Sequence, residues 1–310
     1  MSYSEVHQVT TDQARAFLTE RFNSFSAPQL VGEGAWSRCF SFRRDDKDFV
    51  IRFGSYLEDF QQDELAYRYA SPDLPVPKVL EIGKAFDGYY AVSERVFGEP
   101  LESLSPGEWR RVVPSVVAAL EALRSAALPP HSGVGGWGTE KAPYSTWADH
   151  LLAVGEDGPH RRTHGWSKKL AAFPGGSETF AWGFELLKEV AGAAPRCLVH
   201  SDLINRNVLV KEGAVSGVFD WGCALYGDHL YDLAWFEFWS PWHPNLDVAQ
   251  LRSVLERRWS DSGYAPEHKD SRLLACYLHI GLDHLAYNAH TENWPDLAAT
   301  AKRMRTLVQK

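Results

Sequence analysis

The spacing of a few polar residues after short apolar runs constrains this chain most. Asp202 follows the run Cys197–Val199, and Asn207 lies five residues further on, directly before Val208–Val210. Asp220 then ends the next apolar run. Short apolar runs bounded by turn residues are typical of buried strands. The pattern therefore predicts strands joined by a loop that brings two carboxylates and one amide close together.

The same spacing has a chemical interpretation, because His200-x-Asp202-x4-Asn207 followed by Asp220 is the arrangement that kinases use. Phosphoryl transfer needs an acceptor for the proton of the attacking hydroxyl, which would be Asp202. It also needs oxygen ligands for Mg²⁺, which would be Asn207 and Asp220. Each residue alone could be only a turn former. His200 is expected to be structural, with its ring hydrogen-bonded near the Asp220 loop.

Length and composition limit the class of protein and its partners. A chain of 310 residues exceeds one ordinary core, so two lobes are expected. Apolar residues make up 45% of the sequence, which is enough for a globular core. The net charge of −8 disfavours nucleic acid and anionic membranes as partners and is compatible with a cationic small molecule.

The cysteines and the N-terminus favour the cytoplasm. Cys39, Cys197, Cys223 and Cys276 are far apart and form no Cys-x-x-Cys pair, so a zinc site is not expected and reduced thiols are. The polar start Met1–His7 has no apolar segment typical of a signal peptide. The sequence has no run of 18 apolar residues, so no membrane span is expected.

The first third of the chain predicts a small α+β lobe, residues 1–96. Its order is helix, hairpin, helix, hairpin, because period-2 runs alternate with helical periodicity. The expected elements are a helix over Asp12–Phe22, strands Phe40–Arg44 and Phe49–Phe53 with a turn at Asp45–Asp48, a helix over Glu58–Ala70, and strands Val79–Ile82 and Tyr89–Val96 with a turn at Asp87–Gly88.

Beyond a linker at Phe97–Pro100, residues 97–310 predict a larger and mainly helical lobe. The expected helices are Glu108–Ala126, interrupted at Pro114, then Thr146–Val154, Glu178–Val190 capped by Ser177, His229–Trp239 capped by Asp228, and Arg272–Ala289. A strand is also expected at Val218–Phe219, whereas Gly155–Gly176 gives no clear pattern.

With these pieces in order, the chain resembles the aminoglycoside phosphotransferase family, which has a bilobal, protein-kinase-like α+β fold. The segments Val199–Leu209, Phe219–Trp221 and Gly227–Ala234 carry the resemblance. Hygromycin B phosphotransferases are the most similar members, through stretches such as Leu74–Gly83 and Ile280–Leu285. The resemblance runs from the glycine turn near residue 32 to the last expected helix.

This resemblance implies a site for ATP, with GTP left open, in the smaller lobe. Gly32, Gly34 and Ser37 would cover the phosphates with backbone N–H groups and a hydroxyl. Arg52 stands where kinases have a lysine and would pair with Glu64 of the following helix. The backbone groups of Glu94 and Val96 would bind the base. A simple hairpin turn and a surface Arg–Glu pair are the alternatives.

The acceptor site of such an enzyme should be acidic, because carboxylates attract ammonium groups and aromatic faces cover sugar rings. Glu237 and Asp283 are the best candidates, since each is a charge among apolar residues, and Trp239 could cover a ring. Tryptophans in such a run are more often core residues. Further candidate carboxylates are Asp149, Asp228, Asp232, Glu292 and Asp296.

The leading expectation is therefore a Mg²⁺-dependent phosphotransferase, a cytoplasmic monomer that phosphorylates a hydroxyl of an aminoglycoside such as hygromycin B. A kinase of the same fold that acts on choline, homoserine or a sugar amine is one alternative. A nucleotide-binding module without catalysis is another, and only Arg52 favours it.

Overall fold

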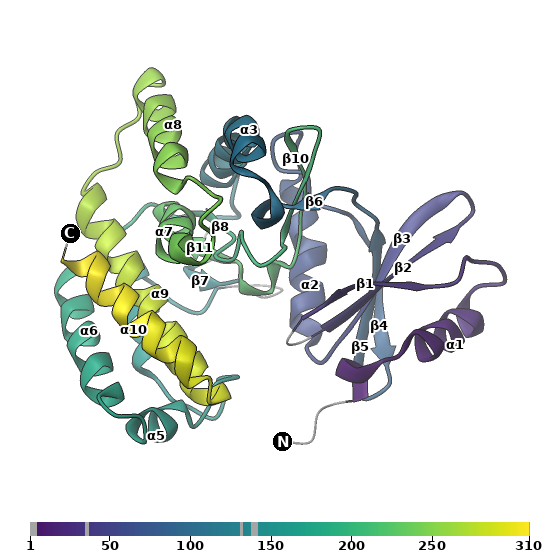
Figure 1. Cartoon of the computed structure of the whole chain (residues 1–310), viewed down its shortest axis with the longest axis horizontal. Coiled ribbons are helices and arrows are strands. Elements are labelled where there is room, and N and C mark those ends of the chain that lie inside the picture. The colour runs from purple at the N-terminus through teal and green to yellow at the C-terminus, as the bar shows by residue number, and fades with distance from the viewer. Residues whose placement is uncertain (1–4, 35–36, 131–132, 138–141, 310) are drawn as a thin grey trace.

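The computed structural model describes residues 5–34, 37–130, 133–137 and 142–309, as an N-terminal sheet followed by a mainly helical part (Figure 1). The sheet is antiparallel with the order β1-β2-β3-β5-β4. Its strands are β1 (Gln29–Glu33), β2 (Ser37–Arg44), β3 (Lys47–Gly54), β4 (Val79–Ala85) and β5 (Gly88–Glu94). The α+β order predicted for this region is confirmed, while a lobe boundary at residue 96 stays a prediction.

Both predicted hairpins form, with one shift. Phe42 pairs with Phe49 across β2 and β3, and Asp45 and Asp46 take positive φ angles in the turn, as a tight hairpin requires. In the second hairpin Gly88 belongs to β5, so the turn residues are Phe86 and Asp87 rather than Asp87 and Gly88. The carboxylate of Asp87 accepts a hydrogen bond from the N–H of Val6, which fixes this turn.

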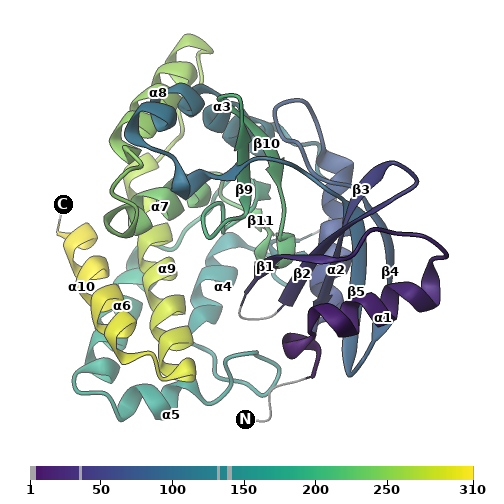
Figure 2. The same ribbon diagram turned by 45° about the vertical axis from the view of Figure 1, so that its right-hand side comes forward.

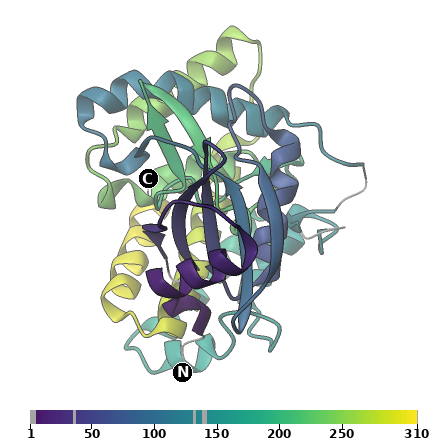
Figure 3. The ribbon, with the colours of Figure 1, turned by 90° about the vertical axis from the view of Figure 1, so that its right-hand side faces the viewer.

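One helix covers each face of the sheet. The helix α1 (Thr11–Arg21) lies on one face of the sheet (Figure 3). Its Leu18 and Phe17 side chains pack onto a core of buried aromatic side chains. The helix α2 (Leu57–Ala66) lies on the opposite face, between the sheet and the helical part (Figure 1), and its Phe60 side chain is buried there. It ends earlier than predicted and continues as a 3₁₀ turn over Tyr67–Tyr69. This position places α2 against both lobes.

The larger lobe contains the remaining helices and two small sheets (Figure 2). Its helices are α3 (Pro106–Ser125), α4 (Trp147–Leu152), α5 (Trp166–Ala171), α6 (Gly176–Val190), α7 (Leu230–Trp239), α8 (Val248–Asp261), α9 (Lys269–Thr291) and α10 (Trp294–Val308). The small sheets have the orders β10-β9-β6 and β7-β11-β8, from β6 (Glu99–Pro100), β7 (Gly135–Gly136), β8 (Cys197–Val199), β9 (Val208–Lys211), β10 (Ala214–Val218) and β11 (Leu225–Gly227).

Three local predictions for this lobe were wrong. Pro114 does not interrupt α3, because its ring lies on the exposed side of a helix whose other side is buried. Ser177 lies inside α6, which begins after Gly175 in a left-handed conformation. Residues 97–100 are not only a linker, since β6 pairs with β9 and leaves no room for a side chain at Gly98, whose Cβ would lie 2.7 Å from the carbonyl oxygen of Val210.

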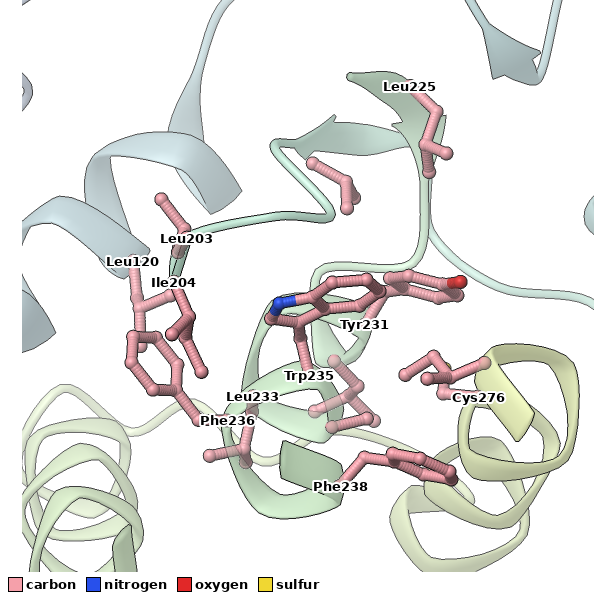
Figure 4. Close-up of a cluster of buried hydrophobic side chains, with 14 of the residues drawn as sticks. Leu120, Leu203, Ile204, Leu225, Tyr231, Leu233, Trp235, Phe236, Phe238 and Cys276 are labelled. Carbon is pink, nitrogen blue, oxygen red and sulfur yellow. The ribbon is translucent and has the colours of Figure 1, made fainter. Parts of the chain in front are cut away.

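The core of the larger lobe supports the loop that carries Asp202. Leu203 and Ile204 of this loop are buried and lie against α7 and α3, close to Phe236 and Leu120 (Figure 4). Burying side chains of this size stabilises a fold by about 1.5–3 kcal/mol each. The loop is therefore held from below by the core. No helix of the described ranges is long and apolar enough to span a membrane.

Candidate active site

A cavity of about 490 Å³ lies between the sheet and the helical lobe, which is in the range of small-molecule sites. Its walls come from β1 to β5 on one side and from the loops around β9 and β10 on the other. The predicted site residues that line it are Gly32, Gly34, Ser37, Arg52, Glu94, Val96, Asn207 and Asp220.

The loop after β8 is fixed by α7. Asp232, buried at the start of α7, accepts hydrogen bonds from the backbone N–H groups of His200 at 3.0 Å and Ser201 at 2.7 Å. The Nε2 atom of His200 lies 3.1 Å from the carbonyl oxygen of Phe219. Burial lowers the pKa of His200 to about 4, so its ring is neutral. The predicted structural role of His200, which joins the two polar segments, is confirmed.

The tautomer of His200 also determines how Asp202 is presented. The N–H of Asp202 donates to Nδ1 of His200 at 3.2 Å, so the ring proton is on Nε2 and points to Phe219. Burial raises the pKa of Asp202 to about 7. The negative charges of Asp220 and Glu102 act in the same direction, and hydrogen bonds from Asn205 and Asn207 oppose them. A carboxyl group whose pKa lies close to neutral pH is suited to act as a general base.

Asn207 and Asp220 offer the oxygen atoms that Mg²⁺ prefers. The amide nitrogen of Asn207 donates to the Asp202 carboxylate at 3.0 Å, which leaves the amide oxygen for other partners. Asp220 has a positive φ of 64°, accepts from Arg52 through Oδ1 at 2.9 Å, and keeps a side chain that is 48% exposed. One amide oxygen and one carboxylate at the cavity wall fit Mg²⁺, which binds few protein ligands and keeps several waters.

Arg52 is buried but pairs with a different helix residue from the one predicted. Its Nη2 atom lies 2.6 Å from the carboxylate of Asp63, and its guanidinium lies 4.7 Å from the centre of the Phe60 ring. Glu64, one residue later on α2, is exposed. The prediction of an Arg52–Glu64 pair was therefore wrong. A step of one residue rotates a side chain by about 100° around a helix, which turns Glu64 away from the sheet.

Asp63 also connects this pair to the segment that carries Asp220. Its Oδ1 accepts from the N–H of Trp221 at 2.8 Å, directly after Asp220. Burial raises the pKa of Asp63 to about 6, although the charge of Arg52 acts to lower it. The helix α2, the strand β3 and the Asp220 loop therefore share one buried charged network, which the sequence indicated only in part.

The glycine turn and the segment after β5 form the other end of the cavity. The N–H of Gly34 donates to the carbonyl of Ser37 at 2.9 Å, while residues 35–36 lie outside the described residues. The N–H of Glu94 donates to the carbonyl of Lys78, and Glu94 is among the residues that line the cavity. Among described backbone carbonyls none accepts from the N–H of Val96. Base binding by these groups stays a prediction.

The two carboxylates predicted for the acceptor site have different positions. The Glu237 carboxylate accepts hydrogen bonds from Arg252 of α8, at 2.9 Å, and from the hydroxyl of Tyr277. Glu237 therefore stabilises the packing of α7, α8 and α9, and its place in an acceptor pocket stays a prediction. Asp283 of α9 is half-buried, and its place in an acceptor pocket also stays a prediction.

A cluster of rings from α7, the turn after it and α9 lies next to Asp283 in the sequence of α9. The ring of His284 lies 4.6 Å from that of Trp239, and Trp239 lies 5.2 Å from the ring of Trp242, which is 38% exposed. Trp239 itself is half-buried, so a role in covering a sugar ring stays a prediction. Of the other candidate carboxylates, Asp228 and Asp232 are buried and have structural roles. Asp228 accepts from the N–H of Leu230 at the start of α7, and Asp232 joins α7 to the backbone of His200.

Sequence reasoning missed two charged residues next to this site. Asp59 of α2 lies against the segment after Asp220, since a Cβ at Gly222 would be 3.0 Å from its Oδ1 atom. Arg162 reaches it from the unpredicted segment before α5, with a hydrogen bond of 2.7 Å. No local pattern could have found this pair, because 103 positions separate the two residues.

Comparison with known proteins agrees with this geometry. The profile of the phosphotransferase enzyme family, APH, matches residues 9–268. Hygromycin-B 4-O-kinase of Escherichia coli is 32% identical over 305 residues, which cover 97% of this chain and 86% of the relative. The crystal structure of aminoglycoside phosphotransferase APH(4)-Ia, also 32% identical, superposes with a TM-score of 0.83 over 97% of this chain and 99% of that one.

Two further structures extend the comparison. A thermostable mutant of APH(4)-Ia in a ternary complex with AMP-PNP and hygromycin B gives a TM-score of 0.82 at 32% identity, covering 95% of this chain and 97% of that one. Spectinomycin phosphotransferase APH(9)-Ia shares the fold at 12% identity, with a TM-score of 0.61 and 96% of each chain covered. The predicted kinase-like fold is confirmed, and the chain belongs to the APH phosphotransferase enzyme family, with APH(4)-Ia among its similar members.

Proposed function

We propose that this protein is an ATP-dependent phosphotransferase that phosphorylates a hydroxyl of an aminoglycoside, with hygromycin B as the first candidate, and so confers resistance. The main support is the 32% identity to Hygromycin-B 4-O-kinase, which spans 97% of the chain and so includes the cavity between the lobes. The grouping of Asp202, Asn207 and Asp220 beside this cavity supports the reaction class.

In the proposed reaction, Asp202 orients the acceptor hydroxyl and receives its proton. The hydroxyl oxygen forms a bond to the γ-phosphorus, while the bond from that phosphorus to the β-phosphate oxygen breaks and ADP leaves. Arg52, which is held between Asp63 and Asp220 in the cavity wall, would direct its guanidinium group toward the nucleotide phosphates. Positioning and charge, more than covalent chemistry by the protein, would supply the rate enhancement.

We further propose that Asn207 and Asp220 hold Mg²⁺, which would neutralise phosphate charge when bound. Their amide and carboxylate oxygens fit this ion, and nucleotide oxygens and water would complete its shell. ATP is the proposed donor, with GTP as the alternative, because backbone groups at Glu94 and Val96 leave no side-chain signature for the base. We also propose that the protein acts as a monomer in the cytoplasm.

Release of ADP tests the proposal and separates it from its alternatives. Purified protein is incubated with Mg-ATP or Mg-GTP and with hygromycin B, other aminoglycosides, choline or homoserine, each in turn. Release that requires hygromycin B supports the proposal. Release with choline or homoserine alone would assign a metabolic kinase, and nucleotide binding without release under any condition would contradict catalysis.

The raised pKa of Asp202 predicts a pH dependence. Because the base must be ionised, kcat/KM for ATP should decline as the pH falls below about 7, the pKa that burial gives Asp202. Glu102 adds a negative charge that raises this pKa, so Glu102→Gln should move the acid limb to lower pH. Gln can still accept the hydrogen bond from the N–H of Arg206. An acid limb unchanged in Glu102→Gln would argue against Asp202 as its origin.

Two adjacent substitutions test the corrected partner of Arg52. Asp63→Ala should lower kcat/KM for ATP by roughly 10- to 100-fold, because a hydrogen bond to a charged group contributes about 1.5–3 kcal/mol. Glu64→Ala, the matched control, should leave kcat/KM nearly unchanged, since that side chain is exposed. Steady-state kinetics at fixed acceptor concentration measures both. A larger effect from Glu64→Ala would restore the original assignment.

A further inference from the structure

The segment between α4 and α5 connects the helical lobe to α2 of the other lobe. Arg162 donates two hydrogen bonds to the carboxylate of Asp59, at 2.7 and 3.1 Å, and its guanidinium lies 3.7 Å from the centre of the Tyr56 ring. Both contacts belong to the N-terminal lobe. The end of the segment is fixed in the helical lobe, because the ring of Trp166 lies 4.5 Å from that of Phe180 in α6 and Lys169 donates to the carbonyl of His290 in α9.

This connection lies beside the proposed reacting groups. A Cβ at Gly222 would lie 3.0 Å from Oδ1 of Asp59, so Asp59 lies against the segment that follows Asp220. The hydroxyl of Ser201, next to Asp202, donates to the carbonyl of Cys223 in the same segment. Asp59 therefore lies close to the loops that carry Asp202 and Asp220. Arg162 brings a cation to that place.

The two partners differ in their freedom to move. The side chain of Arg162 is 39% exposed and comes from a surface segment, whereas that of Asp59 is 15% exposed and belongs to a helix packed between the lobes. Because the Arg162 side chain is partly exposed, its guanidinium can return to solvent when another cation takes its place at Asp59. Asp59 would then remain in place with its charge beside the segment that follows Asp220.

We propose that Arg162 is a displaceable counter-ion of the acceptor site: it neutralises Asp59 in the free protein, and an ammonium group of the acceptor takes its place on binding. The inference rests on the proposed function, because it requires a cationic acceptor beside Asp202. It assigns Asp59, from the nucleotide-binding lobe, as a residue that positions the acceptor. It also makes Arg162 an internal competitor that weakens binding of acceptors without a well-placed cation.

Competition of this kind has a measurable consequence. If the guanidinium occupies Asp59 for most of the time, the apparent affinity for the acceptor is reduced by the fraction of free carboxylate. Removing the guanidinium should therefore tighten acceptor binding, and removing the carboxylate should weaken it. The effect of Arg162 should also vanish when Asp59 is absent, because the two act through one contact.

Calorimetric titration with hygromycin B, without turnover, tests these expectations. Arg162→Gln should lower the Kd for hygromycin B by roughly 3- to 10-fold. Asp59→Asn should raise the Kd, and the double variant should match Asp59→Asn alone. Lys168→Gln, which removes an exposed charge from the nearby helix α5, is the control for net charge and should change the Kd little. Arg162→Lys, which keeps a charge without the planar fork, should give a smaller gain than Arg162→Gln.

The outcomes distinguish failure of the inference from failure of the proposed function. If the wild-type protein binds no aminoglycoside, the proposed function fails. If it binds hygromycin B and Arg162→Gln binds equally or more weakly, only the displaceable counter-ion is overturned. If Arg162→Gln tightens hygromycin B binding by the same factor in the wild-type and the Asp59→Asn background, the displaceable counter-ion is also overturned. Thermal unfolding of each variant identifies any that loses its fold, and Arg162→Lys then carries the test.

Discussion

Asp202→Asn is expected to lower kcat by about 10²- to 10⁴-fold, the contribution typical of a general base. The substitution keeps the shape of the side chain and its hydrogen-bonding capacity toward Asn205 and Asn207. It removes the carboxylate that would receive the proton. The Kd for Mg-ATP should remain nearly unchanged, because the proposed metal ligands Asn207 and Asp220 are intact.

Comparison with Asp220→Ala makes this expectation sharper. Asp220→Ala should lose Mg²⁺-dependent nucleotide binding as well as turnover, since its carboxylate contacts Arg52 and is the proposed metal ligand. Single-turnover kinetics together with nucleotide titration separates the two variants. Full activity of Asp202→Asn, or an equal loss of nucleotide affinity in both variants, would contradict the assignment of Asp202 as the base.

The site elements that the sequence predicted correctly depend on local contacts. His200, Asp202, Asn207 and Asp220 lie within 21 residues of one another, and short strands on either side fix the loop that carries them. The spacing of these residues therefore contains most of the geometry. The hairpins of the N-terminal sheet were predictable for the same reason, since register follows from the turn.

The errors have the opposite origin, because they concern partners distant in the sequence. Arg252 of helix α8, which pairs with Glu237, was not predicted as its partner. Asp59 and Arg162 meet only after the lobes pack. Arg52 pairs with Asp63 and not with Glu64. The order of residues does not tell which side of α2 faces Arg52, so the sequence could not distinguish the two carboxylates. Local periodicity does not determine which side chains meet across a tertiary contact.

The second large effect is expected for stability, at the buried pair of Asp228 and Arg272. The carboxylate of Asp228 is fully buried and accepts from Nε of Arg272 at 2.8 Å, while it also accepts from the N–H of Leu230. This pair fixes the start of α7 to α9. Burial, together with the charge of Arg272, lowers the pKa of the neighbouring His229 to about 4, so that ring is neutral beside the intact pair.

Arg272→Met should therefore lower the free energy of unfolding by about 3–5 kcal/mol, because it leaves an uncompensated buried carboxylate. The double variant Asp228→Asn/Arg272→Met should recover a large part of this loss, since no buried charge remains and Asn can still accept from Leu230. Arg257→Met, at an exposed position of α8, is the control and should change stability by less than about 0.5 kcal/mol.

Urea unfolding of the four proteins measures these differences, and kinetics shows whether they reach the site. The start of α7 carries Asp232, which holds the backbone of His200 and Ser201. If the Asp228–Arg272 pair also fixes Asp232, Arg272→Met should lower kcat in conditions where the variant is still folded, and the double variant should regain it. A stable Arg272→Met with a less stable double variant would show that the charge is compensated by another group.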